Sequence, residues 1–188
     1  MRQTVVLAIC ALCVAVMAPA AWASTAPPPA DTLKVDYFAN ANNSSAPSAL
    51  IRMTNPGTSG GNIQAAIYVF DAFQELSECC ECTLTPDGLR TLSVNTDLTA
   101  NPLTGPPLLT GGLIKIVSTT GSSAAKLVPT PAIRAWGTHI QSGPFSVTET
   151  ASQDATLSTN EVSRLNIECS AVQLDGSGHG ICTCGTGD

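Results

Sequence analysis

The stretch IQAAIYVF, residues 63–70, is the longest β-like run of the chain. Its apolar side chains are nearly continuous and are interrupted by the polar Gln64. A strand with one face in water alternates apolar and polar residues, whereas a strand covered on both faces is apolar along most of its length. The run therefore predicts a central strand that is buried on both sides.

Shorter strands are predicted on both sides of this run. Residues 33–39 follow a mostly alternating pattern, and turn signals at 55–57 and 86–88 separate apolar segments. Further strands are expected at 49–53, 89–94, 113–118, 133–140 and 145–150, with a long loop at 98–112. Seven or eight short strands separated by turns indicate a mainly β fold, an immunoglobulin-like antiparallel β-sandwich over residues 33–157.

The last segment, residues 158–188, has a different pattern. Ser158 followed by Glu161 is a capping-box signature for the start of a helix. Apolar side chains then recur at three-to-four spacing, at Val162, Leu165, Cys169 and Val172. The pattern predicts one C-terminal helix over about 159–173, followed by a glycine-rich, cysteine-containing tail that belongs to the same domain.

The cysteines form the strongest constellation in the sequence. Eight are present, and two of them, Cys10 and Cys13, lie in an apolar N-terminal segment. The other six fall into two groups: Cys79, Cys80 and Cys82, and then Cys169, Cys182 and Cys184. An even number of cysteines in an exported chain indicates a disulfide framework. Bridges within a group would be strained local rings, so we expect bridges between the groups, which would staple the helix and tail to the β body.

A metal site is the alternative for these thiols. Six thiolates and His179 could build a zinc site, although the spacing is not the paired C-x-x-C of zinc ribbons. Export to an oxidising compartment also disfavours free thiolates. Disulfides are therefore the prediction, and no metal ligand or cofactor is assigned to the chain.

The first 23 residues have the layout of a secretory signal peptide. Arg2 precedes an apolar run over 5–17, and Ala21-Trp22-Ala23 places small residues before a cleavage point. The run is too short to cross a bilayer, which needs about 20 residues. Cleavage would leave a Pro-rich arm, residues 24–32, ahead of the first strand. The chain is therefore expected to be secreted, in the extracellular space or the periplasm, with no membrane insertion after cleavage.

The charge of the chain argues against several classes of partner. Lys and Arg total 8 against 14 acidic residues, and no polybasic run is present. This balance disfavours nucleic acids and anionic membranes as partners. Charged residues are 12% of the chain, about half the usual share. A surface so poor in charge suits packing against copies of the same chain or against a cell-surface component.

The remaining polar candidates for a site are isolated in the sequence. His139 lies in the predicted strand 133–140, and the sequence places no nucleophile or carboxylate within its reach, so a structural histidine is expected. Glu75, Glu78 and Glu81 surround the first cysteine group and could bind calcium. They lack the spacing of a calcium loop, which favours a solvated acidic face. No catalytic residue is predicted.

Aromatic residues are only 4% of the chain. Carbohydrate-binding modules usually rely on aromatic platforms, and the candidates outside the signal peptide are Tyr37, Tyr68 and Trp136. Each of the three lies inside a predicted strand. Positions in the core or at a sheet edge are therefore expected for them.

Several runs of sequence together resemble a known group of proteins. They are MTNPG at 53–57, IYVFD at 67–71, and CCEC at 79–82 followed by PDGLRTLSV at 86–94. These runs are similar to uncharacterised secreted bacterial proteins of acidobacterial type, a likeness that extends to Cys182-Thr183-Cys184. The resemblance implies a bacterial origin and an envelope or extracellular location. It implies no activity and no catalytic residues.

Export, a low-charge surface, predicted staples and a Pro-rich arm together favour a non-enzymatic secreted structural or adhesive protein. Its most specific form is the subunit of an extracellular filament, in which residues 33–39 leave their own sheet and complete that of a neighbour. One alternative is a monomeric extracellular binding module for glycan or protein. The other is a metal-binding protein or an enzyme of a type that the sequence does not identify.

Overall fold

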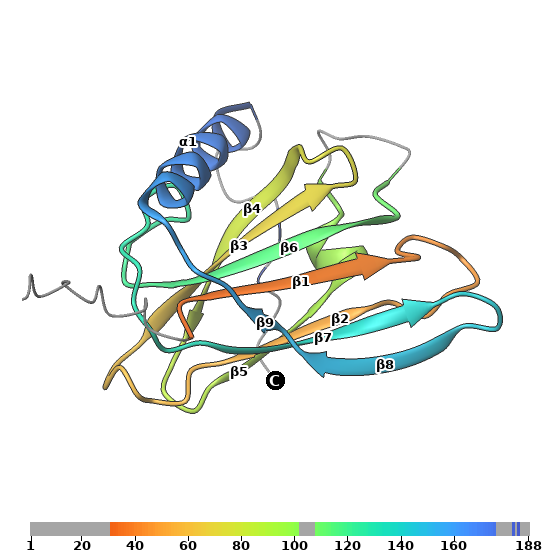
Figure 1. The fold of residues 1–188 in the computed structure, drawn as a ribbon, viewed down its shortest axis with the longest axis horizontal. Coiled ribbons are helices and arrows are strands. Elements are labelled where there is room, and N and C mark those ends of the chain that lie inside the picture. Colours follow the sequence, from red (N-terminus) through yellow and green to blue (C-terminus); the bar gives the residue numbers. More distant parts are fainter. Residues whose placement is uncertain (1–30, 102–107, 176–181, 183, 185–188) are drawn as a thin grey trace, which may run out of the picture.

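Residues 31–101, 108–175, 182 and 184 are described in a computed structural model of the protein (Figure 1). They form two antiparallel sheets and one long α-helix. The first sheet has the strand order β4-β3-β6-β1-β9, and the second has the order β5-β2-β7-β8. The strands are β1 (Leu33–Ala39), β2 (Leu50–Thr54), β3 (Ile63–Asp71), β4 (Leu76–Leu84), β5 (Leu89–Ser93), β6 (Gly111–Thr119), β7 (Arg134–Gln141), β8 (Ser146–Ala151) and β9 (Gln153–Asp154).

Strand β3 is the central strand that residues 63–70 predict. It pairs with β4 on one side and with β6 on the other. Its side chains divide between two apolar clusters. Ile63, Ala65, Ile67 and Val69 enter the cluster between the two sheets, and Ala66, Tyr68 and Phe70 enter a second cluster on the outer face of the first sheet. Both faces of β3 are therefore buried, as predicted.

The cluster between the sheets shows that the two sheets pack face to face. The second sheet contributes Ile51, Met53 and Leu92 to it, and the first contributes Ile114 and Ile116 in addition to the residues of β3. All of these side chains are at most 1% exposed. A mainly β, two-sheet architecture is thus present, as the turn spacing predicts.

Helix α1 (Thr159–Asp175) covers the outer face of the first sheet beside β4, as Figure 1 shows. The predicted capping residue acts at its start, because the Ser158 hydroxyl oxygen accepts a hydrogen bond of 3.1 Å from the backbone N–H of Glu161. Leu165 and Cys169 are fully buried in the second cluster, and Val162 and Val172 pack against it. The predicted apolar stripe is therefore the face that the helix buries.

Three elements were not predicted. The cysteine-bearing segment is a nine-residue strand, β4, which forms a hairpin with β3. Residues 94–98 form a π-helical turn, η1 (Val94–Leu98), directly after β5. Among the described strands, the two-residue strand β9 pairs only with β1, at Lys34 and Val35. It follows β8 after one residue, so the chain crosses there from the second sheet to the first.

The predicted signal peptide (1–23), most of the predicted arm (24–30 of 24–32) and His179 lie outside the described residues. The last two residues of the predicted arm belong to the folded body. The Asp31 carbonyl accepts hydrogen bonds from the backbone N–H groups of Ala132 and Ile133, and the Thr32 carbonyl accepts one from Ser118. Among the described residues, no helix is long and apolar enough to cross a membrane.

Candidate functional site

The six cysteines form three disulfides, and each joins the first group to the second. The pairs are Cys79–Cys169, Cys80–Cys182 and Cys82–Cys184, with Cα–Cα distances of 5.7, 5.4 and 5.3 Å. Side chains alternate along β4, so Cys79 faces the helix while Cys80 and Cys82 face the space between the sheets. One bridge therefore ties α1 to the outer face of the sheet, and two bridges tie the tail to its inner face.

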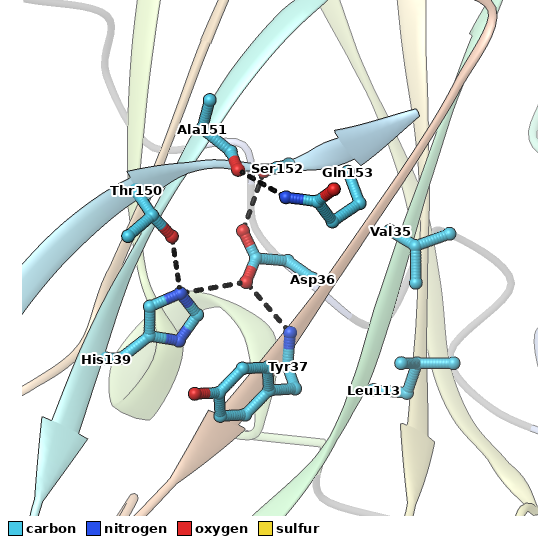
Figure 2. A pocket seen from close by; sticks show the side chains of 9 residues that line it. All are labelled: Val35, Asp36, Tyr37, Leu113, His139, Thr150, Ala151, Ser152 and Gln153. Carbon is cyan, nitrogen blue, oxygen red and sulfur yellow. Dashed lines mark hydrogen bonds and ion pairs between the residues drawn. The ribbon is translucent and has the colours of Figure 1, made fainter. Parts of the chain in front are cut away.

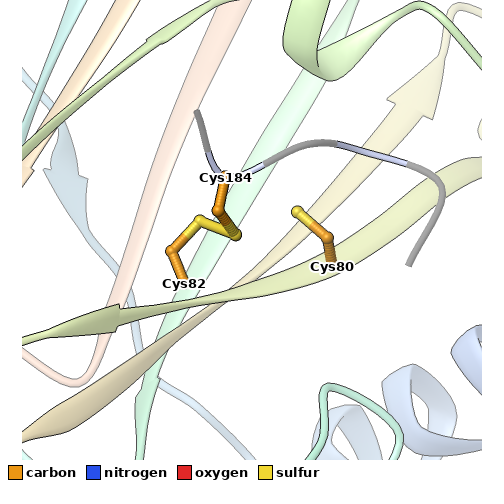
Figure 3. Close-up of side chains that lie close together, drawn as sticks. All are labelled: Cys80, Cys82 and Cys184. Carbon is orange, nitrogen blue, oxygen red and sulfur yellow. A yellow bond between two sulfur atoms is a disulfide. The ribbon is translucent and has the colours of Figure 1, made fainter. Parts of the chain in front are cut away.

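The two inner bridges bring sulfur atoms close together. The Sγ atoms of Cys80, Cys82 and Cys184 all lie within 4.8 Å of one another, and Figure 3 shows Cys80 beside the Cys82–Cys184 bridge. Such a group could hold a soft metal ion if its members were thiolates. In this structure each of these sulfurs is bonded to another sulfur, so the group would first have to be reduced.

The acidic residues around the first cysteine group do not share one environment. Glu75 is exposed, Glu81 is half-buried, and Glu78 is only 1% exposed. The solvated acidic face predicted for all three is therefore wrong for Glu78. One carboxylate oxygen of Glu78 accepts a hydrogen bond of 2.6 Å from the backbone N–H of Asn101, while the other has no hydrogen-bond partner among the described residues. Burial raises the pKa of Glu78 to about 7, against this single compensating hydrogen bond.

A second polar group lies at the opposite edge of the sandwich, where β8 crosses to β9. We call Asp36, His139, Thr150 and Ser152 the polar cluster. The buried Asp36 carboxylate accepts hydrogen bonds of 2.6 Å from the Ser152 hydroxyl and of 2.8 Å from the Tyr37 backbone N–H (Figure 2). It fits only because residue 137 is glycine, since a Cβ atom there would come within 2.1 Å of an Asp36 oxygen. Asp36 thus links β1 to Ser152, the residue at which the chain crosses from β8 to β9.

His139 completes the polar cluster from β7. Its Nε2 atom lies 2.9 Å from the Thr150 hydroxyl oxygen and 3.5 Å from Asp36 Oδ1. Its Nδ1 atom is buried and has no hydrogen-bond partner among the described residues. His139 is buried, as a structural histidine would be, but it does have a carboxylate nearby. In a Ser-His-Asp triad the hydroxyl and the carboxylate contact different ring nitrogens. Here both face Nε2, so the group does not form that relay.

The three aromatic candidates have different surroundings. Tyr68 is fully buried, and its hydroxyl donates a 2.6 Å hydrogen bond to the Ala124 carbonyl. Trp136 is half-buried on β7. Tyr37 is 55% exposed, and its ring stacks on the His139 ring with centroids 4.3 Å apart and planes at 23°. A pocket of about 200 Å³ lies beside this stack, and Figure 2 shows the residues that line it.

Comparison with known proteins adds little to this geometry. No protein-family model matches the chain, and no curated protein matches it. The crystal structure of Thermotoga maritima 1070 is similar to the chain with a TM-score of 0.43 and 12% sequence identity, over 68% of this chain and 97% of that one. We draw nothing about function from a likeness of this size.

Proposed function

We propose that this chain is an exported, non-enzymatic structural or adhesive protein of the extracellular space or cell envelope. The observation that carries the proposal is the set of three disulfides, which fix the helix and the tail to opposite faces of β4. Disulfides persist in oxidising compartments and are rare in the cytosol. The sequence likeness to secreted bacterial proteins and the signal-peptide layout of residues 1–23 support the same location.

The arrangement of the three disulfides supports a mechanical role. Each bridge spans 90 or 102 residues of sequence, so the helix and tail cannot separate from the sheet without breaking a bond. We also propose that the fold is immunoglobulin-like in its architecture, which means two antiparallel sheets packed face to face. The strand orders β4-β3-β6-β1-β9 and β5-β2-β7-β8 differ from the ABED and CFG orders of immunoglobulin constant domains.

Analysis of native secreted material tests this proposal. We expect N-terminal sequencing to begin at Ser24, and non-reducing digestion to link peptides of the 79–82 group to peptides that carry Cys169, Cys182 and Cys184. Negative-stain imaging and size exclusion then report the assembly state. Unprocessed chain that starts at Met1 in the membrane fraction, or six free thiols in the secreted protein, would reject export and stapling together.

Filament assembly is the more specific form of the proposal. In the single chain, β1 pairs with β6 along all seven of its residues. Assembly would require the same residues 33–39 to fill that place in a neighbour, which a preceding Pro-rich arm permits. Strand β8 is a second contact site for this assembly, because all six of its residues are exposed and it pairs only with β7 among the described strands.

Deletion of residues 24–39 separates strand exchange from a simple spacer arm. Exchange predicts monomers that fold or are rescued by an added peptide of residues 33–39. A spacer arm predicts a destabilised monomer that the peptide helps little. If the full-length secreted protein stays monomeric at high concentration, the filament form fails, and the alternative of a monomeric binding module takes its place. The pocket beside Tyr37 is the observation that favours this alternative.

A further inference from the structure

The ring of Tyr37 is exposed but held in place. Its side chain lies at the outer edge of β1, beyond the residue at which β9 begins, because the described part of β9 pairs with β1 at Lys34 and Val35. One face of the ring stacks on His139. That histidine is itself buried and contacts the Thr150 hydroxyl through Nε2. The platform is therefore ordered before any ligand arrives, which lowers the entropy cost of binding.

The pocket beside the ring has the size and lining of a site for one small ring. Its volume of about 200 Å³ lies below the roughly 300 Å³ at which pockets for drug-sized ligands begin. Val35 and Leu113 give it an apolar wall. Thr150 and Gln153 add a hydroxyl and an amide. The hydroxyl already contacts His139 Nε2 at 2.9 Å and the amide nitrogen donates to the Ala151 carbonyl at 3.5 Å, but each group has capacity for at least one further hydrogen bond.

The charge of the lining selects against ions. No Lys or Arg is among the residues that line the pocket, all of which belong to the described part of the chain. Its one carboxylate, Asp36, is buried, and each of its oxygens already accepts a hydrogen bond, from Ser152 or from the Tyr37 N–H. An anionic ligand would find neither a lysine nor an arginine, and a cation would find a carboxylate that is already occupied. The lining suits a neutral molecule with one apolar face and several hydroxyl groups.

We propose that this pocket binds one ring of a neutral glycan, with the C–H face of the sugar on the Tyr37 ring and its hydroxyls hydrogen-bonded to Thr150 and Gln153. This inference rests on the proposed function in one respect, because the glycan would be the ligand of the proposed adhesive protein. It does not depend on filament assembly. His139 is a positioning residue, because it acts on the ligand through the Tyr37 ring.

Titration of the full-length mature protein with three neutral oligosaccharides tests the site. The probes are maltohexaose, cellohexaose and the hexamer of N-acetylglucosamine, and binding is followed by NMR chemical-shift changes at Tyr37, Thr150 and Gln153. We expect at least one probe to bind and to shift these residues. Failure of all three probes to bind the folded protein would overturn the proposal, as would stronger binding of the anionic polygalacturonate.

Two matched substitutions of exposed aromatic residues test whether the glycan binds on the Tyr37 ring. Tyr37→Ala should weaken binding by about tenfold or more, because it removes a stacking surface. Phe73→Ala removes an aromatic ring that is 85% exposed in the turn between β3 and β4, and it should leave binding unchanged. His139→Ala should weaken binding less than Tyr37→Ala while Tyr37→Phe retains it. Equal loss of glycan binding in the Tyr37→Ala and Phe73→Ala variants would refute the site. The proposed export and structural role are tested separately, by the N-terminus, disulfides and assembly state of secreted material.

Discussion

The two long edges of the sandwich are closed by different means. At the edge of β4, covalent bonds attach the helix and the tail to the sheet. At the edge where β8 crosses to β9, noncovalent polar contacts close the space between the sheets. Asp36 binds Ser152 there, and the buried ammonium of Lys34 contacts Asp31 at 2.6 Å and Asp154 at 2.7 Å. We refer to these as the disulfide edge and the polar edge.

The difference shows where the molecule can present a site. A disulfide joins two elements without burying a charged group, and the covalent bond keeps the attached helix or tail on the sheet. Buried polar groups are usually hydrogen-bonded, so contacts of this kind extend only as far as hydrogen-bond partners are present. At the polar edge, β9 pairs with β1 at Val35 and Lys34 but does not extend to Tyr37. The Asp36 carboxylate accepts the Tyr37 N–H that a longer neighbouring strand would have used. The ring of Tyr37 is exposed beyond that point. The polar edge is therefore the one that carries the exposed ring on which the proposed glycan site depends.

Removal of the outer bridge should have the largest effect on stability. The double variant Cys79→Ala/Cys169→Ala is expected to lower the free energy of unfolding by roughly 2–5 kcal/mol. Its helix should lose protection first, because that bridge is its covalent tie to β4. Urea unfolding and hydrogen exchange measure both quantities. The matched variant Cys82→Ala/Cys184→Ala keeps the helix bridge, and equal loss of helix protection in the two variants would contradict this assignment.

A buried carboxylate at the disulfide edge should make stability depend on pH. The pKa of Glu78 is about 7 in the folded protein against 4.5 as its ordinary value. Below the lower value both states are protonated and no cost arises. As pH rises toward 7 the unfolded state ionises first, so the folded protein loses stability. Glu78→Gln keeps an acceptor for the Asn101 N–H and should be the more stable protein by a few kcal/mol at about pH 8.

Urea unfolding of wild type and the Glu78→Gln variant at about pH 4 and pH 8 provides the check. The advantage of the variant should vanish at the lower pH. Glu75→Gln is the control, because Glu75 is exposed and its charge carries no burial cost. A constant difference between wild type and Glu78→Gln across this range would show that the carboxylate is not the cause.

A substitution that crowds the polar cluster should lower the free energy of unfolding by a moderate amount. Gly137→Ala places a Cβ atom 2.1 Å from an Asp36 oxygen, so the carboxylate must move and its hydrogen bond from Ser152 must weaken. We expect a loss of about 2 kcal/mol in thermal or urea unfolding. In the Asp36→Ala background the same change should cost less, because the clash is gone. Additive costs in that double-mutant cycle would mean that the two residues do not interact.

Removal of the helix cap should have the smallest effect on stability. Ser158→Ala removes the acceptor for the Glu161 N–H and is expected to cost about 1 kcal/mol. With the Cys79–Cys169 bridge intact, the change should appear as faster hydrogen exchange in the first turn of α1 only. Ser158→Asp preserves a capping oxygen and should restore protection. Loss of protection along the whole helix would show that the bridge does not hold the helix by itself.

Much of the fold could be predicted from local sequence patterns. The central strand at 63–70 and the helix at 159–173 both appear close to their predicted bounds, as β3 and α1. Strand β4 could not be predicted in this way. Its cysteines and Glu78 are buried on both faces of the strand, so neither an alternating nor a continuous apolar pattern marks it.

The candidate site could not be predicted for a related reason. Asp36 and Ser152 are 116 residues apart in the chain, and His139 reaches them from a different sheet. Each has an unremarkable sequence neighbourhood. Their contact depends on the pairing register of β7 with β8, which aligns Gly137 with Thr150, and on how the two sheets pack. Periodicity along one strand contains no information about either.

The sequence by itself determined most of the strands, though not β4 or β9, as well as where the helix begins and that six cysteines stand in two groups of three. These features depend on side chains a few residues apart. Only the tertiary structure decided the rest. It divided the first cysteine group between the helix and the tail, because Cys79 lies on the face of β4 that α1 covers, whereas Cys80 and Cys82 lie on the other face. It also buried Glu78 and exposed Tyr37, since the burial of a side chain depends on what the neighbouring sheet, helix and chain crossing cover.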